Sequence, residues 1–292
     1  MAEGHAVLMK FLPGTLIVIL VALALVDLGP AIGISDQLNA ILTIFLGLAF
    51  TLLHGGATLG KTRLAVFFGI TILVSFSSEA LGVATGWIFG SYYYSDNLGP
   101  KLLGVPPMIQ AAYVGMGYAS MVMARIILGA EETPRGKNLL AVALCASAIM
   151  VAWDLSMDPY QSTVVGDWIW RNGGTYFGVP MHNYLGWFCT VFVFLFLYLK
   201  YEGTNPLPAV SGSTASRFFW SLPVIYYFLN ALGIALTPVV DSIKPPIASP
   251  QNYPGSLDAL QQSLTLICVF AMGVPVLIAL CRLLPNSKSA SA

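Results

Sequence analysis

The chain has 292 residues, of which 57% are hydrophobic and only 9% are charged, and its formal net charge is zero. A soluble domain carries about 25% charged residues, so this composition excludes an ordinary soluble protein. The zero net charge also excludes a basic nucleic-acid-binding protein, and a mean hydropathy of +0.78 favours a chain embedded in a lipid bilayer.

Apolar runs long enough to cross a membrane follow one another along the chain. A spanning helix needs about 20 mostly apolar residues. The first run follows Lys10 like a signal peptide, but it lacks a clear small-residue cleavage site, so we expect it to be retained as an anchor. The sequence predicts an all-α polytopic bundle of about eight transmembrane helices in one domain, 1–292. The predicted spans are 9–28, 38–56, 63–82, 107–129, 138–157, 183–200, 218–238 and 260–283.

The lysines and arginines predict the orientation of this bundle. If the N-terminus is cytoplasmic, ten of them fall at cytoplasmic ends and loops and only Lys101, Arg171 and Lys244 fall outside. Cytoplasmic loops carry an excess of Lys and Arg, so we expect a multi-pass cell-membrane protein with both termini in the cytoplasm. The ten are Lys10, Lys61, Arg63, Arg125, Arg135, Lys137, Lys200, Arg217, Arg282 and Lys288.

The cysteines and histidines do not form a metal-binding pattern. The four cysteines lie in apolar runs without CxxC spacing, and we interpret them as small buried hydrophobes. The three histidines are too few for a histidine-box di-iron site. His54 lies near the cytoplasmic end of the second span, and we expect it to be a structural histidine bonded to a neighbouring helix.

An internal repeat relates approximately 63–129 to 138–200. The first unit contains Glu79, then Gly86-Trp87-Ile88-Phe89 and Leu103-Gly104-Val105-Pro106. The second contains Asp154, then Asp167-Trp168-Ile169-Trp170 and Phe177-Gly178-Val179-Pro180. Both units enter from the predicted cytoplasmic side, so the repeat is parallel. It places Glu79 and Asp154 at matching depth near the outer ends of their helices.

Three acidic residues are the candidate catalytic residues. Ionisable side chains inside a membrane are costly and are functional hypotheses by default. Glu79 shares one helical face with Thr71 and Ser75, and Asp154 and Asp158 lie one turn apart on another helix. Two carboxylates so close resist double ionisation, so this pair is suited to hold a proton. We expect Glu79 and Asp154 to face one cavity.

Polar and aromatic residues gather at the same predicted level of the bundle. They open the fourth and sixth spans, occupy the seventh, and crowd the outer loops 83–106 and 158–182. Some aromatic rings belong to the interfacial belt, whereas others can stabilise a cationic intermediate. The candidate substrate-binding residues are Trp87, Tyr94, Gln110, Tyr113, Trp168, Tyr176, Asn183, Trp187 and Asn230.

A carboxylic acid, a carboxylate and aromatic faces together suit acid-catalysed chemistry on an alkene. The acid protonates the double bond, a tertiary carbocation forms beside the rings, and water adds while the other carboxylate accepts a proton. This chemistry needs no cofactor and no metal. An acidic cavity in the membrane also suits a proton-coupled transporter, so the residues alone leave both functions open.

A resemblance to a known family favours the enzyme. The stretch from Glu79 through Tyr92-Tyr93-Tyr94 to Pro106, together with Trp153-Asp154-Leu155-Ser156-Met157-Asp158-Pro159 and the segment 176–187, resembles the polytopic carotenoid biosynthesis family over roughly residues 70–190. This family includes the CruF-type carotenoid 1,2-hydratases and the bisanhydrobacterioruberin hydratases. The resemblance implies a carotenoid hydratase, which adds water to the terminal double bond of a linear carotenoid end and gives a tertiary alcohol.

The resemblance also implies which partners to expect and leaves two questions open. The partners would be a linear carotenoid, the lipid bilayer and other carotenoid enzymes, without nucleic acid. An end-group cyclase would use the same protonation step, so it remains an alternative beside the transporter. The roles of the carboxyls also stay open. Either the Asp154–Asp158 pair is the general acid and Glu79 directs the attacking water, or Glu79 is the acid and the pair directs the water.

Overall fold

The computed structural model describes residues 2–130, 136–205, 217–243 and 253–284, and residues 2–10 by their backbone alone. The positive charges Arg135, Lys244 and Lys288 lie outside the described residues.

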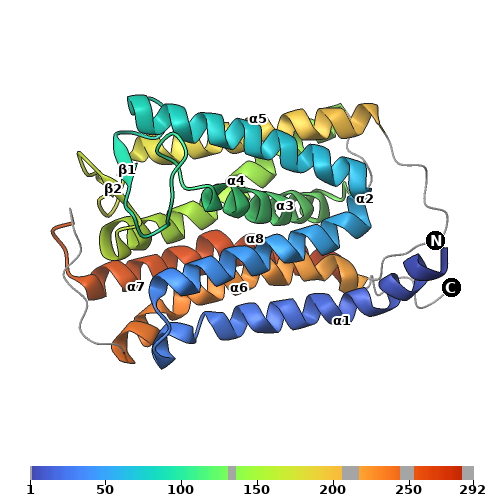
Figure 1. Cartoon of the computed structure of the whole chain (residues 1–292), viewed down its shortest axis with the longest axis horizontal. Helices are drawn as coiled ribbons and strands as arrows, with labels where there is room; N and C mark the ends of the chain where they lie inside the picture. The colour runs from blue at the N-terminus through green and yellow to red at the C-terminus, as the bar shows by residue number, and fades with distance from the viewer. Residues whose placement is uncertain (1, 131–135, 206–216, 244–252, 285–292) are drawn as a thin grey trace.

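Long helices make up almost all of the described structure, so the prediction of an all-α membrane bundle is confirmed. Within the described residues, six helices are long and apolar enough to span a membrane, and a shorter apolar helix covers Phe11–Val26. The helices run nearly parallel or antiparallel to one another (Figure 1). They are α1 Ala2–Val26, α2 Asp36–Thr85, α3 Met108–Leu128, α4 Lys137–Tyr160, α5 Met181–Thr204, α6 Arg217–Ile243, α7 Leu257–Ile267 and α8 Gly273–Leu283.

The 50-residue helix α2 makes two passes through the bundle. Gly60 breaks it with a φ of 73° and a ψ of 162°, a conformation that glycine adopts without steric cost. The chain doubles back there, so the two arms of α2 lie at different places in the bundle (Figure 1). With α1, and with α7 and α8 joined into one span by the π-helical turn Cys268–Met272, the passes agree with the predicted eight.

The predicted outer loop 158–182 begins later than expected. Helix α4 continues past Pro159 into a π-helical turn, Gln161–Val165, that ends at Gly166 in the left-handed conformation. The Gln161 carbonyl accepts the backbone N–H groups of both Gly166 and Asp167, which closes the turn. The extra helix keeps Asp158 on a rigid element rather than in a loop.

Two short strands cover the end of the bundle opposite the start of α1 (Figure 1). Strand β1, Tyr92–Tyr94, pairs antiparallel with β2, Trp168–Trp170, and Tyr93 lies opposite Ile169. Each strand is followed by the same small turn. Leu103 and Phe177 have positive φ values of 50° and 49°, and each lies inside a bridge, Leu102 with Val105 and Tyr176 with Val179.

One of these matched turns lies in each unit of the predicted internal repeat. Leu103 and Phe177 are the non-glycine residues with positive φ among the described residues, and they occupy equivalent places in the two units. Antiparallel pairing of two equivalent strands is what a twofold relation between the units would produce. We therefore propose a pseudo-twofold relation between 63–129 and 138–200, with its axis between Tyr93 and Ile169.

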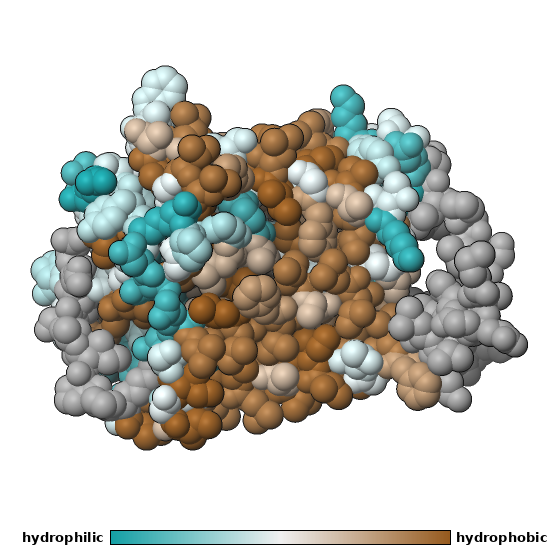
Figure 2. Space-filling model, viewed as in Figure 1, coloured by the Kyte–Doolittle hydropathy of each residue, from teal (hydrophilic) through white to brown (hydrophobic). Residues whose placement is uncertain are grey.

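The surface has the distribution expected of a membrane protein. Hydrophobic side chains cover the middle of the visible face, and hydrophilic ones gather toward its two ends (Figure 2). Large apolar side chains such as Phe45, Leu73, Leu185 and Phe270 are exposed on the helices. Exposed apolar surface of this extent suits contact with lipid.

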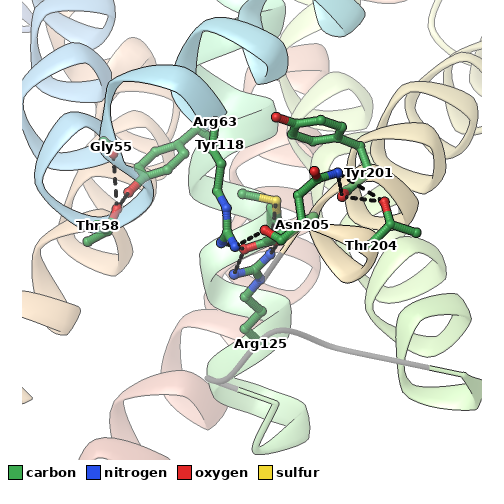
Figure 3. Close-up of polar contacts among 10 residues, drawn as sticks. Gly55, Thr58, Arg63, Tyr118, Arg125, Tyr201, Thr204 and Asn205 are labelled. Atoms are coloured by element: carbon green, nitrogen blue, oxygen red, sulfur yellow. Dashed lines mark hydrogen bonds and ion pairs between the residues drawn. The ribbon is translucent and has the colours of Figure 1, made fainter. Parts of the chain in front are cut away.

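At the end of the bundle that carries Gly60, a buried ionic cluster joins three helices. Glu202 of α5 pairs with Arg63 of α2, 3.2 Å away, and with Arg125 of α3, and all three side chains are almost fully buried. Arg63 also donates to the Asn205 carbonyl that follows α5 (Figure 3). Two residues counted as cytoplasmic positive charges are therefore buried ion-pair partners.

His54 lies in a separate network at the same end and is bonded to neighbouring helices, as predicted. Its Nδ1 is 2.6 Å from the Tyr118 hydroxyl on α3, and its Nε2 is 3.0 Å from the Phe219 carbonyl on α6. Thr58 also bonds Tyr118, 2.8 Å away (Figure 3). The imidazole therefore ties α2 to two other helices.

The orientation of the bundle can be tested by cysteine labelling. We expect a cysteine at Asp96, whose side chain is fully exposed, to react with an impermeant reagent in intact cells. A cysteine at the exposed Lys137, at the other end, should react only after the membrane is opened. The background should lack the native cysteines, and the buried Asp167 is unsuitable as a labelling position. Labelling of the cysteine at Lys137 in intact cells, and of the cysteine at Asp96 only after the membrane is opened, would show that the topology is inverted.

Candidate acid cavity

Three carboxyl groups from two helices meet below the strand pair. Glu79 comes from the second arm of α2, and Asp154 and Asp158 come from successive turns of α4. Each is at most 2% exposed. All three line one cavity of about 40 Å³. The helical faces that the sequence predicted as inward therefore do converge.

Glu79 accepts hydrogen bonds from three tyrosines. The Tyr92 and Tyr94 hydroxyls donate to its Oε2 at 2.5 and 2.9 Å, and the Tyr113 hydroxyl donates to Oε1 at 2.8 Å. Burial, and then the negative charge of Glu79, raise the pKa of Tyr92 and Tyr94 well above that of an ordinary tyrosine. The hydroxyls therefore remain protonated donors at any physiological pH.

Asp158 also accepts three hydrogen bonds. Trp168 Nε1 and Trp170 Nε1 donate to its Oδ1 at 2.7 and 3.4 Å, and Asn183 Nδ2 donates to Oδ2 at 2.8 Å. Indole nitrogens donate only, and donors aimed at a carboxylate favour its charged form.

Asp154 has a poorer set of partners than the other two carboxyls. Among the described residues its carboxyl has a single hydrogen-bond donor, Asn183 Nδ2, 3.1 Å from Oδ2. The same amide nitrogen therefore bridges Asp154 and Asp158, using one hydrogen for each. The three carboxyls thus receive unequal support, with Asp154 the least supported.

The strand pair explains how residues distant in sequence reach these acids. Alternate residues of a strand project to the same face, so Tyr92 and Tyr94 point together toward Glu79 while Tyr93 is exposed. Trp168 and Trp170 point together toward Asp158 by the same rule. Antiparallel pairing then places the donors of the two strands over neighbouring acids.

Close packing fixes the loop before β1 against α5. A Cβ atom on Gly186 would lie 2.1 Å from the Ile88 carbonyl oxygen, so only glycine fits there. Phe89, which follows Ile88, lines the acid cavity. Gly186 therefore lets the first loop approach α5 closely enough to close the cavity.

Most of the predicted binding residues lie at or beside the cavity. Tyr94, Trp168, Asn183 and Trp187 line it. Tyr113 does not line the cavity, but its hydroxyl donates to Glu79 and its ring stacks on Trp187, with ring centroids 4.4 Å apart.

The other predicted residues lie farther from the acids. Gln110 is buried one helical turn from Tyr113 and bonds Ser75. Tyr176 donates to the Leu155 carbonyl at 3.0 Å, and Asn230 lines a different cavity.

Trp87 is a correction to the sequence prediction. Its side chain is 78% exposed, and it lines neither described cavity. Helix α2 ends at Thr85, Gly86 turns the chain with a φ of 71°, and the Trp87 N–H bonds the Thr85 hydroxyl. The strand that pairs with Trp168–Trp170 is Tyr92–Tyr94, so matching the two Trp-Ile-aromatic triplets aligned the wrong residues.

Tyr92, Trp153 and Trp170 were not predicted as site residues, yet all three line the cavity. The alternation of Tyr92 with Tyr94, and of Trp170 with Trp168, is the signal that could have identified two of them. Trp153 precedes Asp154 directly and contacts Trp187 edge to face, with ring centroids 6.1 Å apart.

A larger cavity of about 220 Å³ lies beside the acid cavity. Its lining combines apolar side chains such as Ile44 and Ile234 with polar ones such as Asn39 and Asn230, and it includes four aspartates, Asp27, Asp36, Asp167 and Asp241. Within the described residues, no group of three or more His, Cys, Asp or Glu side chains is placed to hold a metal ion.

A polytopic helical membrane bundle with a buried cavity of carboxyls and aromatic rings is therefore the class that fold and site define. The chain belongs to the carotenoid biosynthesis protein family, whose model matches residues 38–249. This match confirms the resemblance seen in the sequence. It covers both passes of α2 and the whole acid cavity.

One curated relative is the bisanhydrobacterioruberin hydratase of Haloarcula japonica, 33% identical over 116 residues. The match covers 39% of this chain and 38% of that protein, so the two are similar over well under half of either length. No solved structure matches the chain.

Proposed function

We propose that this protein hydrates a linear carotenoid, adding water to the terminal double bond of its end group to give a tertiary alcohol. The observation that carries the proposal is the unequal hydrogen bonding of three buried carboxyls in one cavity. Family membership and the hydratase relative support a reaction of carotenoid biosynthesis.

The hydrogen-bond partners support a distinct role for each acid. Glu79 and Asp158 each accept three donors, which favours the ionised form of both. Asp154 has one donor and two carboxylate neighbours, so a proton shared within the cluster is best placed on Asp154. Asp154 is then the general acid, and Glu79 or Asp158 is the base.

The proton balance of the reaction follows from these roles. Asp154 gives its proton to the less substituted carbon of the double bond, and the positive charge forms on the tertiary carbon. Water attacks that carbon and loses a proton to Glu79 or Asp158. This proton returns to Asp154 through the cavity, so the net change is the addition of one water to the alkene.

The lining of the cavity suits this intermediate. The rings of Trp168, Trp170 and Trp187 border the acids, and aromatic faces attract a cation. A volume of about 40 Å³ has room for a few water molecules, since each needs about 10–15 Å³ by this measure. Space for water beside the acids favours hydration over cyclisation as the fate of the cation.

The proposed function can be tested in a bacterial host that makes lycopene, a linear carotene. We expect the protein to convert the pigment to products heavier by the mass of one water molecule for each end modified. The same host with an empty vector is the control. A cyclase would change retention without changing mass, and unaltered pigment with the protein present in the membrane would contradict both enzymatic functions.

A further inference from the structure

The acid cavity and the larger cavity share one wall. Five residues border both: Ile109 and Ala112 of α3, Trp153 and Met157 of α4, and Trp168 of β2. The two spaces therefore lie back to back, separated by single side chains.

The volumes of the two cavities suit different occupants. The acid cavity, at about 40 Å³, is too small for a whole carotenoid end group. The larger cavity, at about 220 Å³, exceeds the roughly 150 Å³ of an engineered cavity that binds benzene, so it can hold an isoprenoid end. Asn39, Asn230 and Thr237 also border it, so water can enter the same space.

Helix α4 presents the wall and the acids side by side. Trp153 and Met157 are one turn apart on one face, and Asp154 and Asp158 are one turn apart on the adjacent face. A group that passed Trp153 from the larger cavity would meet Asp154 next.

The position of Trp153 is coupled to the acid cavity by stacked rings. Trp153 contacts Trp187 edge to face, Trp187 stacks on Tyr113 at an interplanar angle of 7°, and Tyr113 donates to Glu79. Ala112 of α3 has the smallest side chain of the five residues that border both cavities. A larger side chain at this position would therefore thicken the wall.

Building on the proposed function, we propose that the larger cavity is the binding chamber for the carotenoid end group. The wall at Ala112, Trp153 and Met157 is then its passage to the acids and decides which end groups reach them. The terminal double bond passes this wall to meet Asp154, while the rest of the end group stays in the chamber.

Two substitutions of alanine by phenylalanine separate the chamber from the passage. Ala40→Phe fills the larger cavity, so the purified protein should lose most of the carotene that co-purifies with it, together with its hydration activity. Ala112→Phe thickens the wall, so it should keep more of its carotene than Ala40→Phe does while hydration falls about 10²-fold, because the double bond no longer reaches the acid. Ala141→Phe, on an exposed position of α4, is the matched control.

A rescue variant distinguishes a blocked passage from a damaged fold. Combining Ala112→Phe with Trp153→Ala removes bulk from the same wall and should restore much of the lost hydration. Trp220→Ala, on α6 near His54, removes a tryptophan far from both cavities and should not restore it. Ala112→Leu gives a smaller, graded block if phenylalanine is not tolerated there.

The outcomes that overturn the proposal are specific. If Ala40→Phe contains as much carotene as Ala141→Phe, the larger cavity is not the binding chamber. If Ala112→Phe hydrates carotene at the rate of the control, the wall is not the passage to the acids. If the wild-type protein binds carotene and Ala40→Phe alone does not, but the wild-type protein never hydrates it, the proposed function is refuted. The assignment of the larger cavity as the carotene-binding chamber would still hold.

Discussion

Replacing Asp154 by asparagine is expected to lower the rate of carotene hydration by about 10²–10⁴-fold, the usual contribution of a general acid. Asparagine keeps the size of the side chain and can still bond Asn183, but it cannot supply the proton. Carotene binding should be unchanged, because the binding chamber lies behind the wall that Trp153 forms. The measurement is the hydration rate in detergent or liposomes, with bound carotene measured in the same preparation.

The neighbouring acids provide the comparison. Glu79→Gln and Asp158→Asn should also be slow, because each removes a carboxylate that could accept the proton from water. Asp258→Asn, at an exposed aspartate of α7 that bonds Gln262, is the control and should be fully active. A well-folded Asp154→Asn protein with near wild-type activity would exclude Asp154 as the acid.

Replacing Glu202 by glutamine is expected to lower the free energy of unfolding by about 3–5 kcal/mol, the usual loss when one partner of a buried ion pair is removed. Glu202 is the acidic partner of both Arg63 and Arg125, and all three side chains are buried. Glutamine would leave two guanidinium groups without a balancing charge. Denaturant or thermal unfolding in detergent measures the change.

The matched control is Asp96→Asn, which breaks a fully exposed pair with Lys101. An exposed pair contributes little, so no measurable change in stability is expected. Glu202→Gln protein that remains folded should still hydrate carotene, because Arg63 lies 16 residues before Glu79, about 24 Å along the helix. Wild-type stability for Glu202→Gln would show that the cluster does not hold the three helices together.

The sequence alone was sufficient to determine the membrane bundle and its inward-facing acids. Each spanning helix must be apolar over the thickness of the hydrocarbon core, so the spans can be predicted from the local composition of the sequence. The helical period decides which residues share a face, so Glu79, Asp154 and Asp158 could be placed inward without coordinates. The family resemblance rested on contiguous motifs, and the family match over residues 38–249 agrees with it.

Tertiary structure decided which aromatic residues serve the acids. The register of β1 against β2 brought Tyr92 and Trp170 into the cavity and left Trp87 in a turn, where it is exposed. A shift of one residue in a strand reverses its faces, and nothing local in a three-residue strand specifies that register. Aromatic richness in the loops was therefore visible in the sequence, whereas the assignment of each ring was not.

The long-range contacts also could not be predicted from the sequence. Arg63 and Glu202 are separated by 139 residues, and their pairing depends on how α2 turns back at Gly60 and where α5 ends. The larger cavity is lined by residues of α2, α3, α4 and α6 and of the segments beside them, among them Asp27, Ile44 and Asn230. Composition and periodicity are properties of single segments, whereas cavities, donor sets and ion pairs arise only where segments meet.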